Sequence, residues 1–142
     1  MGALDEGVPF MEKGIQHKFR IKRVYDDPSA DDGFRFLVDR LWPRGMKMGE
    51  LDTTGWLKEV APSPSLRGWF WHEEAKWHKF RQYYRAELAA NPDAWAPLVE
   101  AIKSNNVTLL YAARDRQINH AVVLRDFLIE KNKHNETTKE RH

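Results

Sequence analysis

The chain has 142 residues and a formal net charge of +2, with 42% hydrophobic and 31% charged residues, which suits one folded domain. The small net charge argues against a dedicated nucleic-acid-binding protein, and no apolar run reaches the ~20 residues of a membrane span. The absence of cysteine excludes disulfides, thiolate chemistry and cysteine-ligated zinc, and with no signal-peptide pattern it favours a cytoplasmic protein.

One α/β domain is predicted over residues 17–131. Residues 1–16 are polar and have no apolar centre, which predicts a flexible leader. Residues 132–142 are almost all polar or charged, which predicts a polar tail. No repeat or low-complexity segment divides the sequence, so we expect a single folded unit.

The first half of the domain is predicted to hold two strands. Charged and apolar residues alternate over Lys18–Tyr25, which is typical of a strand with one buried face. An almost continuous apolar run predicts a second strand over Phe34–Leu41. The acidic segment Asp26–Gly33 between them has no apolar anchor and predicts a loop. Leu51–Val60 is predicted as a short helix.

The second half is predicted to be mostly helical. Ser63-Pro64 and Asn91-Pro92 each combine a capping side chain with a proline, which marks a helix start. The predicted elements are a helix over Glu73–Ala90, a helix over Asp93–Ser104, a buried strand over Val107–Ala112, a loop over Ala113–Gln117 and a last helix carrying Ala121, Leu124 and Leu128. This order predicts an α/β fold, a small two-layer or three-layer sandwich with a mainly parallel sheet and flanking helices.

Two predicted strand ends carry most of the side chains able to support chemistry. They are Asp39, Arg40 and Arg44 at one end, and Tyr111, Arg114, Asp115, Arg116, Asn119 and His120 at the other. Parallel strands end at one edge of a sheet, where open α/β sheets place their sites. Arginine donates paired hydrogen bonds to phosphate and carboxylate groups. The sequence therefore predicts a pocket for a small anionic or phosphorylated ligand, held by Arg40 and Arg44 and oriented by Asn119.

Histidine is the first candidate for proton transfer, because it titrates near neutral pH. His120, His72 and Asp39 are therefore the candidate catalytic residues, and the sequence leaves open whether any reaction is catalysed. A structural interpretation stands beside this one. Each histidine is then packed or solvated, the carboxylate is paired at its strand end, and Asp115 caps the last helix.

Metal binding and serine nucleophiles receive no support from residue spacing. His72 and His78 are six positions apart and lie on different helix faces, while Glu74 and His78 share a face but make only two ligands. Helix capping explains Ser63, and no nucleophile motif surrounds it. We predict no metal and no cofactor.

Aromatic and basic residues interleave near the middle of the chain. They are Trp69, Trp71, Trp77 and Tyr83 with Lys76, Lys79 and Arg81. Such a surface can stack bases and hold phosphates, so a nucleic-acid-associated or regulatory protein is an alternative function. A solvated amphipathic helix explains the same pattern. A third hypothesis is that the tryptophans form the interface of a homodimer.

The sequence resembles the YeaO-like family, within Domain of Unknown Function 488. The most specific segment is Leu37-Val38-Asp39-Arg40-Leu41-Trp42-Pro43-Arg44-Gly45, and the resemblance spans roughly Phe19 to Glu130. Further matching residues are Lys22-Arg23-Val24-Tyr25, Asp32-Gly33, Trp56, Lys58-Glu59, Ala61-Pro62-Ser63, Leu66-Arg67, His72, Phe80, Tyr84, Glu87-Leu88, Thr108-Leu109-Leu110-Tyr111-Ala112 and Asn119-His120-Ala121.

The resemblance implies a compact, cytosolic α/β domain of bacterial or archaeal distribution, and it implies no activity because the family is uncharacterised. Other branches of the wider family carry a Cys-His-Arg-like triplet where this chain has Asn119-His120-Ala121. Cysteine-dependent activity is therefore not expected here. The matched positions give the candidate ligand-binding residues: Arg40, Arg44, Ser63, Arg67, Tyr111 and Asn119.

Overall fold

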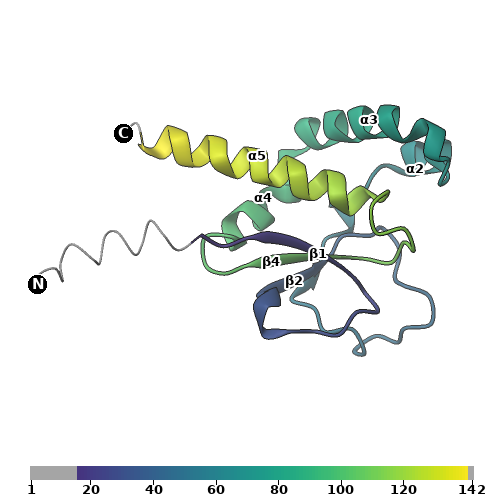
Figure 1. The fold of residues 1–142 in the computed structure, drawn as a ribbon, viewed down its shortest axis with the longest axis horizontal. Helices are drawn as coiled ribbons and strands as arrows, with labels where there is room; N and C mark the ends of the chain where they lie inside the picture. Colours follow the sequence, from purple (N-terminus) through teal and green to yellow (C-terminus); the bar gives the residue numbers. More distant parts are fainter. Residues whose placement is uncertain (1–15, 141–142) are drawn as a thin grey trace, which may run out of the picture.

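The computed structural model describes residues 16–140, with side chains for residues 16–134. The predicted leader therefore lies outside the described residues, apart from Gln16. Within the described part, one four-stranded sheet is accompanied by four α-helices, as Figure 1 shows. The strands are β1 (Phe19–Arg23), β2 (Phe34–Leu37), β3 (Gly55–Trp56) and β4 (Val107–Tyr111), and the helices are α2 (Pro64–Phe70), α3 (Trp77–Ala90), α4 (Pro92–Ala101) and α5 (His120–Glu140). The predicted α/β class is confirmed.

All strand pairings in the described sheet are parallel, in the order β1–β4–β2–β3. β4 lies in the middle, and its Leu109 pairs in register with Ile21 of β1 and Phe36 of β2. All five residues of β4 are buried. A central parallel strand is covered on both faces, which explains the continuous apolar pattern from which this strand was predicted.

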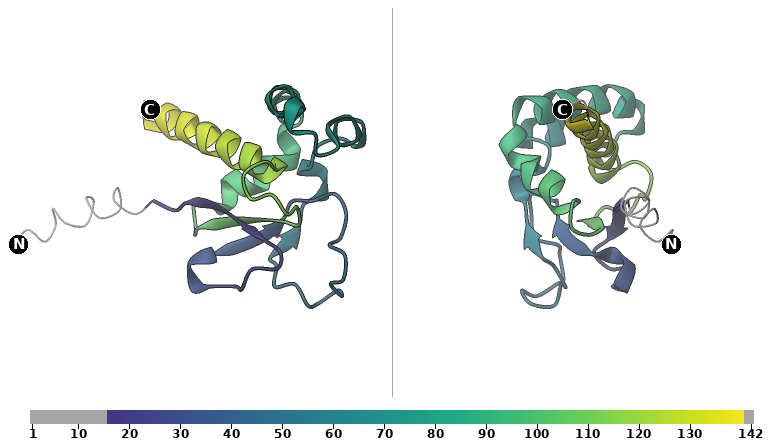
Figure 2. Two further views of the ribbon diagram at one scale, coloured as in Figure 1. Left: turned by 45° about the vertical axis from the view of Figure 1, so that its right-hand side comes forward. Right: turned by 90° about the vertical axis from the view of Figure 1, so that its left-hand side faces the viewer.

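The described helices lie on one side of the sheet, and loops cover its other side (Figures 1 and 2). α5 contacts β1 and β4, and α3 packs against α5. Side chains alternate across β4, so Leu109 and Tyr111 join the helix-side core while Leu110 joins a smaller cluster under the loops. The molecule is thus a two-layer sandwich, which selects one of the two predicted arrangements.

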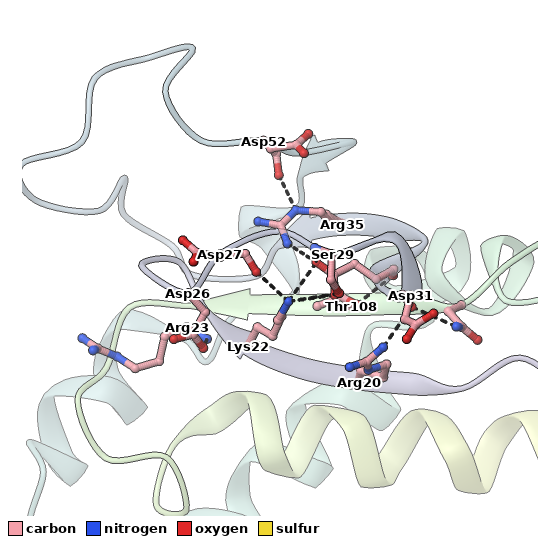
Figure 3. A network of polar contacts seen from close by, with 12 residues as sticks. Arg20, Lys22, Arg23, Asp26, Asp27, Ser29, Asp31, Arg35, Asp52 and Thr108 are labelled. Carbon is pink, nitrogen blue, oxygen red and sulfur yellow. Dashed lines mark hydrogen bonds and ion pairs between the residues drawn. The ribbon is translucent and has the colours of Figure 1, made fainter.

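A buried carboxylate, that of Asp32, anchors the acidic loop. Figure 3 shows the neighbouring polar residues of this loop, among them Asp27, Ser29 and Asp31. Asp32 is fully buried and accepts hydrogen bonds from Lys22 Nζ at 3.0 Å and Ser29 Oγ at 2.9 Å. It also pairs with the guanidinium of Arg35. Burial raises the pKa of Asp32, but hydrogen bonds from Ser29, Lys22 and Arg35 outweigh burial and hold this pKa well below its ordinary value. The loop has a polar anchor in place of an apolar one.

The helix start at Ser63-Pro64 and the apolar periodicity of α3 are confirmed. Ser63 Oγ accepts a hydrogen bond from the backbone N of Leu66 at 3.2 Å, which caps α2. Phe80, Tyr84 and Leu88 recur every four residues along α3, and all three are buried. The hydroxyl of Tyr84 keeps a partner inside the core, because it donates to a backbone carbonyl at 2.7 Å.

The prediction of a helix over Leu51–Val60 is wrong. Gly55 and Trp56 form the short strand β3, which pairs with the end of β2, and Lys58–Val60 form a single 3₁₀ turn. The backbone N of Leu57 also donates to a β2 carbonyl at 2.9 Å. Pairing with a strand distant in sequence decides this conformation, and local periodicity does not report it.

The second predicted strand ends at Leu37 instead of Leu41. The backbone N of Val38 still donates to β4 at 3.0 Å. One residue later, the side chain of Asp39 accepts the hydrogen bond from the backbone N of Ala112 at 3.0 Å. A side-chain carboxylate thus takes the place of the next ladder carbonyl, so the strand ends where the polar residues begin.

Two helix boundaries differ from prediction, and one predicted side-chain cap is absent. The helix predicted from Glu73 begins as α3 at Trp77, after a 3₁₀ turn. α4 begins directly after Asn91, as predicted, but the Asn91 side chain makes no capping hydrogen bond. α5 continues to Glu140, so the residues from Asn132 onward that were predicted as a polar tail are helical as far as the structure describes them.

Candidate functional site

The carboxyl ends of β2 and β4 lie side by side, because these neighbouring strands run parallel. A cavity of about 280 Å³ opens there, between the sheet edge, the end of α2 and the start of α5. Of the nine predicted site residues it is lined by Asp39, Arg40, Arg67, His72, Asn119 and His120. Its apolar lining includes Leu41, Pro62, Phe70, Trp71, Phe80 and Ile118. The predicted meeting of the two strand ends is confirmed.

Asp39 and His120 form the polar centre of this cavity. Asp39 Oδ1 lies 3.3 Å from His120 Nε2, and both side chains are 17% exposed. Oδ2 is held by the backbone N of Ala112, whereas Oδ1 is a buried oxygen with no hydrogen bond among the described residues. Burial raises the pKa of Asp39, and the nearby charges of His120 and Arg67 oppose this rise.

The hydrogen-bond geometry fixes which nitrogen of His120 carries a proton. Nε2 faces two acceptors, the carbonyl of Val38 at 3.0 Å and the carboxylate of Asp39, so it bears a hydrogen. Nδ1 has no hydrogen bond within the described part of the chain, and it is not among the buried unpaired atoms there. This nitrogen is therefore accessible in a residue that lines the cavity, where it can accept a proton or a hydrogen bond.

The predicted arginines differ in how many of their hydrogen-bond donors are already bound by other residues of the protein. Arg40 donates through Nε and Nη2 to the carbonyls of Pro62 and Ala61, at 3.3 and 3.2 Å. Arg44 is exposed and does not line the cavity. Arg67 lines the cavity, and its guanidinium makes no hydrogen bond or ion pair with any described residue. Arg67 is thus the arginine whose donors are available to a ligand.

Three other predicted binding residues have structural contacts. The hydroxyl of Ser63 donates to Glu87 at 2.5 Å while capping α2, outside the lining of this cavity. Tyr111 is buried in β4 and also lies outside the lining, and burial raises its pKa. Asn119 lines the cavity, but its amide binds the Asp115 carbonyl and the backbone N of Val122. The side chain that caps α5 is therefore Asn119.

The interleaved aromatic and basic residues divide between core and surface. Trp77 packs against Phe70 and Phe80 in the helix-side core. Trp69 packs edge-on against an exposed tyrosine at 5.4 Å, and Lys76 Nζ donates to its carbonyl at 2.8 Å. Trp71 is 65% exposed and lines the cavity. The nucleic-acid and homodimer hypotheses remain predictions.

The pairing of Asp39 with His120 and the aromatic rim at Trp71 were missing from the site expected from sequence. Asp39 and His120 are 81 positions apart, and each was selected separately, as a polar residue at a strand end and as a candidate catalytic residue, without a contact between them being predicted. Trp71 was considered as part of a nucleic-acid-binding surface, a solvated helix or a homodimer interface, and not as part of this pocket. The available signal was its position four residues after Arg67, which brings both to the same end of α2.

Among residues 16–134, whose side chains the structure describes, no group of three or more histidine, aspartate or glutamate side chains lies close enough to hold a metal ion. Among residues 16–140, no helix is both long and apolar enough to cross a membrane.

Comparison with known proteins assigns the chain to a family. A family model described as the inactive DUF488-N3 subclade matches residues 18–142. The uncharacterized protein YeaO of Escherichia coli is 46% identical over 107 residues, which cover 75% of this chain and 93% of that protein. Uncharacterized proteins of Mycobacterium bovis and Mycobacterium tuberculosis are 38% identical over 111 residues, which cover 78% of this chain and 93% of each relative. No solved structure matches. The chain therefore belongs to the DUF488 family, as a YeaO-like member of the subclade described as inactive.

Proposed function

We propose that the cavity at the carboxyl ends of β2 and β4 binds a small anionic ligand without covalent chemistry. The observation that carries this proposal is the guanidinium of Arg67, which is exposed, lines the cavity near the charge of Asp39, and makes no hydrogen bond or ion pair with the described residues. A guanidinium fork matches the oxygen pairs of phosphate, phosphonate and carboxylate groups. A cytoplasmic location is part of the same proposal and rests on the cysteine-free composition.

His120 supplies the second polar contact in this proposal. Its Nε2 is fixed by Val38 and Asp39, so its Nδ1 is the nitrogen left for a ligand. In the doubly protonated imidazole, Nδ1 donates a hydrogen bond to an anion while Nε2 keeps its contacts with Val38 and Asp39. Arg40 adds positive charge at the same cavity while holding the segment before α2.

Binding without covalent catalysis is favoured by the residue at position 119. Asn119 has no nucleophilic atom, and its amide is occupied by the cap of α5. The description of the subclade as inactive agrees with this feature. The pocket therefore has polar side chains that can bind a ligand, but Asn119 cannot supply a thiolate nucleophile.

The test measures binding of methylphosphonate by isothermal titration calorimetry and by thermal shift. We expect saturable binding, with a rise in stability of about 2.7 kcal/mol at 100 times the dissociation constant. Arg67→Ala should weaken binding about tenfold or more. Arg81→Ala is the matched control, because Arg81 is exposed on α3 and does not line the cavity. Equal affinity in the two variants, or no binding to the parent protein, would contradict the proposal.

A further inference from the structure

Two consecutive residues at the cavity have a backbone conformation that non-glycine residues rarely adopt. Trp71 has φ 37° and His72 has φ 60°, and they are the non-glycine residues with positive φ in the described part of the chain. The left-handed region is unfavourable for an L-residue, because Cβ comes too close to the following carbonyl oxygen. Such strained residues cluster at binding and active sites. Both residues line the cavity.

The helix end alone does not account for a tryptophan at this position. Trp71 is the left-handed residue that terminates α2, and its backbone N donates to the carbonyl of Arg67 at 3.0 Å. Glycine is the usual residue at such a position, because it has no Cβ to clash. The indole of Trp71 gains little from packing, since the residue is 65% exposed and its one recorded ring contact is to His72 at 5.9 Å. The strain instead presents a flat aromatic ring at the cavity.

The surroundings of Trp71 define what this ring can bind. Leu41 also lines the cavity and is 58% exposed, and Phe70 stacks on Phe80 at 4.4 Å in the wall behind. The available guanidinium of Arg67 belongs to the last turn of the helix that Trp71 ends. An apolar rim beside one free cation complements a ligand with a flat apolar part and one acidic group.

Resting on the proposed function, we infer that the ligand is a single-ring aromatic anion. Its ring stacks on Trp71, and its acidic group binds Arg67. The cavity of about 280 Å³ lies at the small end of ligand pockets. This volume suits one ring with one acidic group better than a large cofactor.

The test compares phenylphosphonate with methylphosphonate, which share the acidic group and differ in the ring. The parent protein should bind phenylphosphonate about tenfold more tightly than methylphosphonate, as stacking on an aromatic side chain predicts. Trp71→Asn should remove most of this preference, because asparagine tolerates the left-handed conformation but has no ring. Trp71→Phe should keep it. Trp69→Ala is the control, since Trp69 does not line the cavity, and it should leave the preference unchanged.

The backbone strain at Trp71 can be tested separately, by measuring the melting temperature of a glycine variant. Trp71→Gly should raise the melting temperature while abolishing the preference for phenylphosphonate, because glycine relieves the unfavourable φ and removes the ring. A lower melting temperature for this variant would overturn the strain argument. Light scattering on the parent protein and on Trp71→Asn tests the competing hypothesis that the indole belongs to a homodimer interface. If the parent is a dimer and this variant a monomer, Trp71 serves an interface and the inference is wrong.

The outcomes separate this inference from the function on which it rests. If methylphosphonate binds through Arg67 but phenylphosphonate binds no more tightly, the aromatic inference falls and the anion pocket stands. If neither phosphonate binds to the parent protein, both fall. A preference that Trp71→Asn removes and Trp69→Ala retains supports both.

Discussion

Replacement of Asp32 by asparagine should destabilise the protein severely, although this residue lies far from the cavity. Asparagine keeps the shape and one carbonyl oxygen of the aspartate but removes its charge. Arg35, with a side chain only 6% exposed, then has no carboxylate partner, and Lys22, at 18% exposure, loses its own ion pair. Figure 3 shows Lys22, Arg35 and Ser29 reaching toward one another from two strands and a loop, and all three bind the carboxylate of Asp32.

The expected size of this effect follows from burial. Breaking a buried ion pair by removing one partner costs about 3–5 kcal/mol, because the remaining charge is left without compensation. For a chain of this length such a loss corresponds to a decrease in melting temperature of roughly 10 °C. The folded-state pKa of Asp32 is lowered from an ordinary value of 3.8. Its stabilising contribution is therefore present above pH 3.8 and is lost as the pH falls through the lowered value.

Urea denaturation followed by circular dichroism at pH 7 and at pH 3 measures both effects. The neighbouring Asp31→Asn is the matched control, because Asp31 is exposed and only its backbone carbonyl is recorded as a hydrogen-bond acceptor. Asp32→Asn should lose several kcal/mol at pH 7 and less at pH 3, while Asp31→Asn stays within about 0.5 kcal/mol of the parent. If the two variants unfold at the same urea concentration, the loop is not anchored by its buried carboxylate.

Two further predictions concern the surface ion pair and the tight loop contact. The hydrogen bond from Arg116 lowers the pKa of Asp26 from 3.8 to about 2. Arg116→Gln should destabilise the protein only slightly at pH 7, because the Arg116 side chain is exposed to solvent. This destabilisation should fade between pH 4 and pH 2, and an equal effect at both ends of a pH series would refute it. Gly33 has φ 63°, and a Cβ there would lie 2.1 Å from the carbonyl oxygen of Asn106. Gly33→Ala should therefore cost about 3 kcal/mol or more in thermal unfolding. Gly45→Ala should cost only about 1 kcal/mol, because its φ is also positive but no atom lies within 4 Å.

The fold was predictable where local pattern and long-range contacts require the same conformation. The run Val107–Tyr111 is apolar because β4 is buried on both faces, and the repeat Phe80, Tyr84, Leu88 is apolar because one face of α3 is buried. Ser63 caps α2 by an interaction contained within four residues. In each case the side chains that form the sequence pattern are also the side chains that make the stabilising contacts.

The sequence was misleading where a distant partner decides the local conformation. β3 exists because it pairs with the end of β2, so the segment around Gly55 has no strand signal of its own. Asp32 looked like a solvated loop residue, and only the arrival of Lys22 and Arg35 from two strands makes its burial favourable. Hydrophobic periodicity does not record such pairings.

The candidate site was predictable as a sheet edge and unpredictable as a set of contacts. The parallel order of β2 and β4 brings Asp39 and His120 together, as the strand-end argument requires. The choice among arginines depends on side-chain partners. Arg40 is held by two backbone carbonyls, whereas Arg67 is unpaired within the described residues. The family resemblance, and not the local pattern, selected Arg67.

The energetic costs gathered at this cavity argue that it binds something. A buried carboxylate oxygen without a hydrogen bond is unfavourable, and Asp39 Oδ1 is one. A tryptophan with positive φ is also unfavourable, and Trp71 lines the same cavity. Asn119, in contrast, makes hydrogen bonds with both ends of its amide and stabilises the start of α5. This residue therefore has a structural role. A ligand with an apolar ring and an acidic group would contact both the strained Trp71 and the Arg67 guanidinium in this pocket, whereas the unpaired oxygen of Asp39 calls for a hydrogen-bond donor on the same ligand.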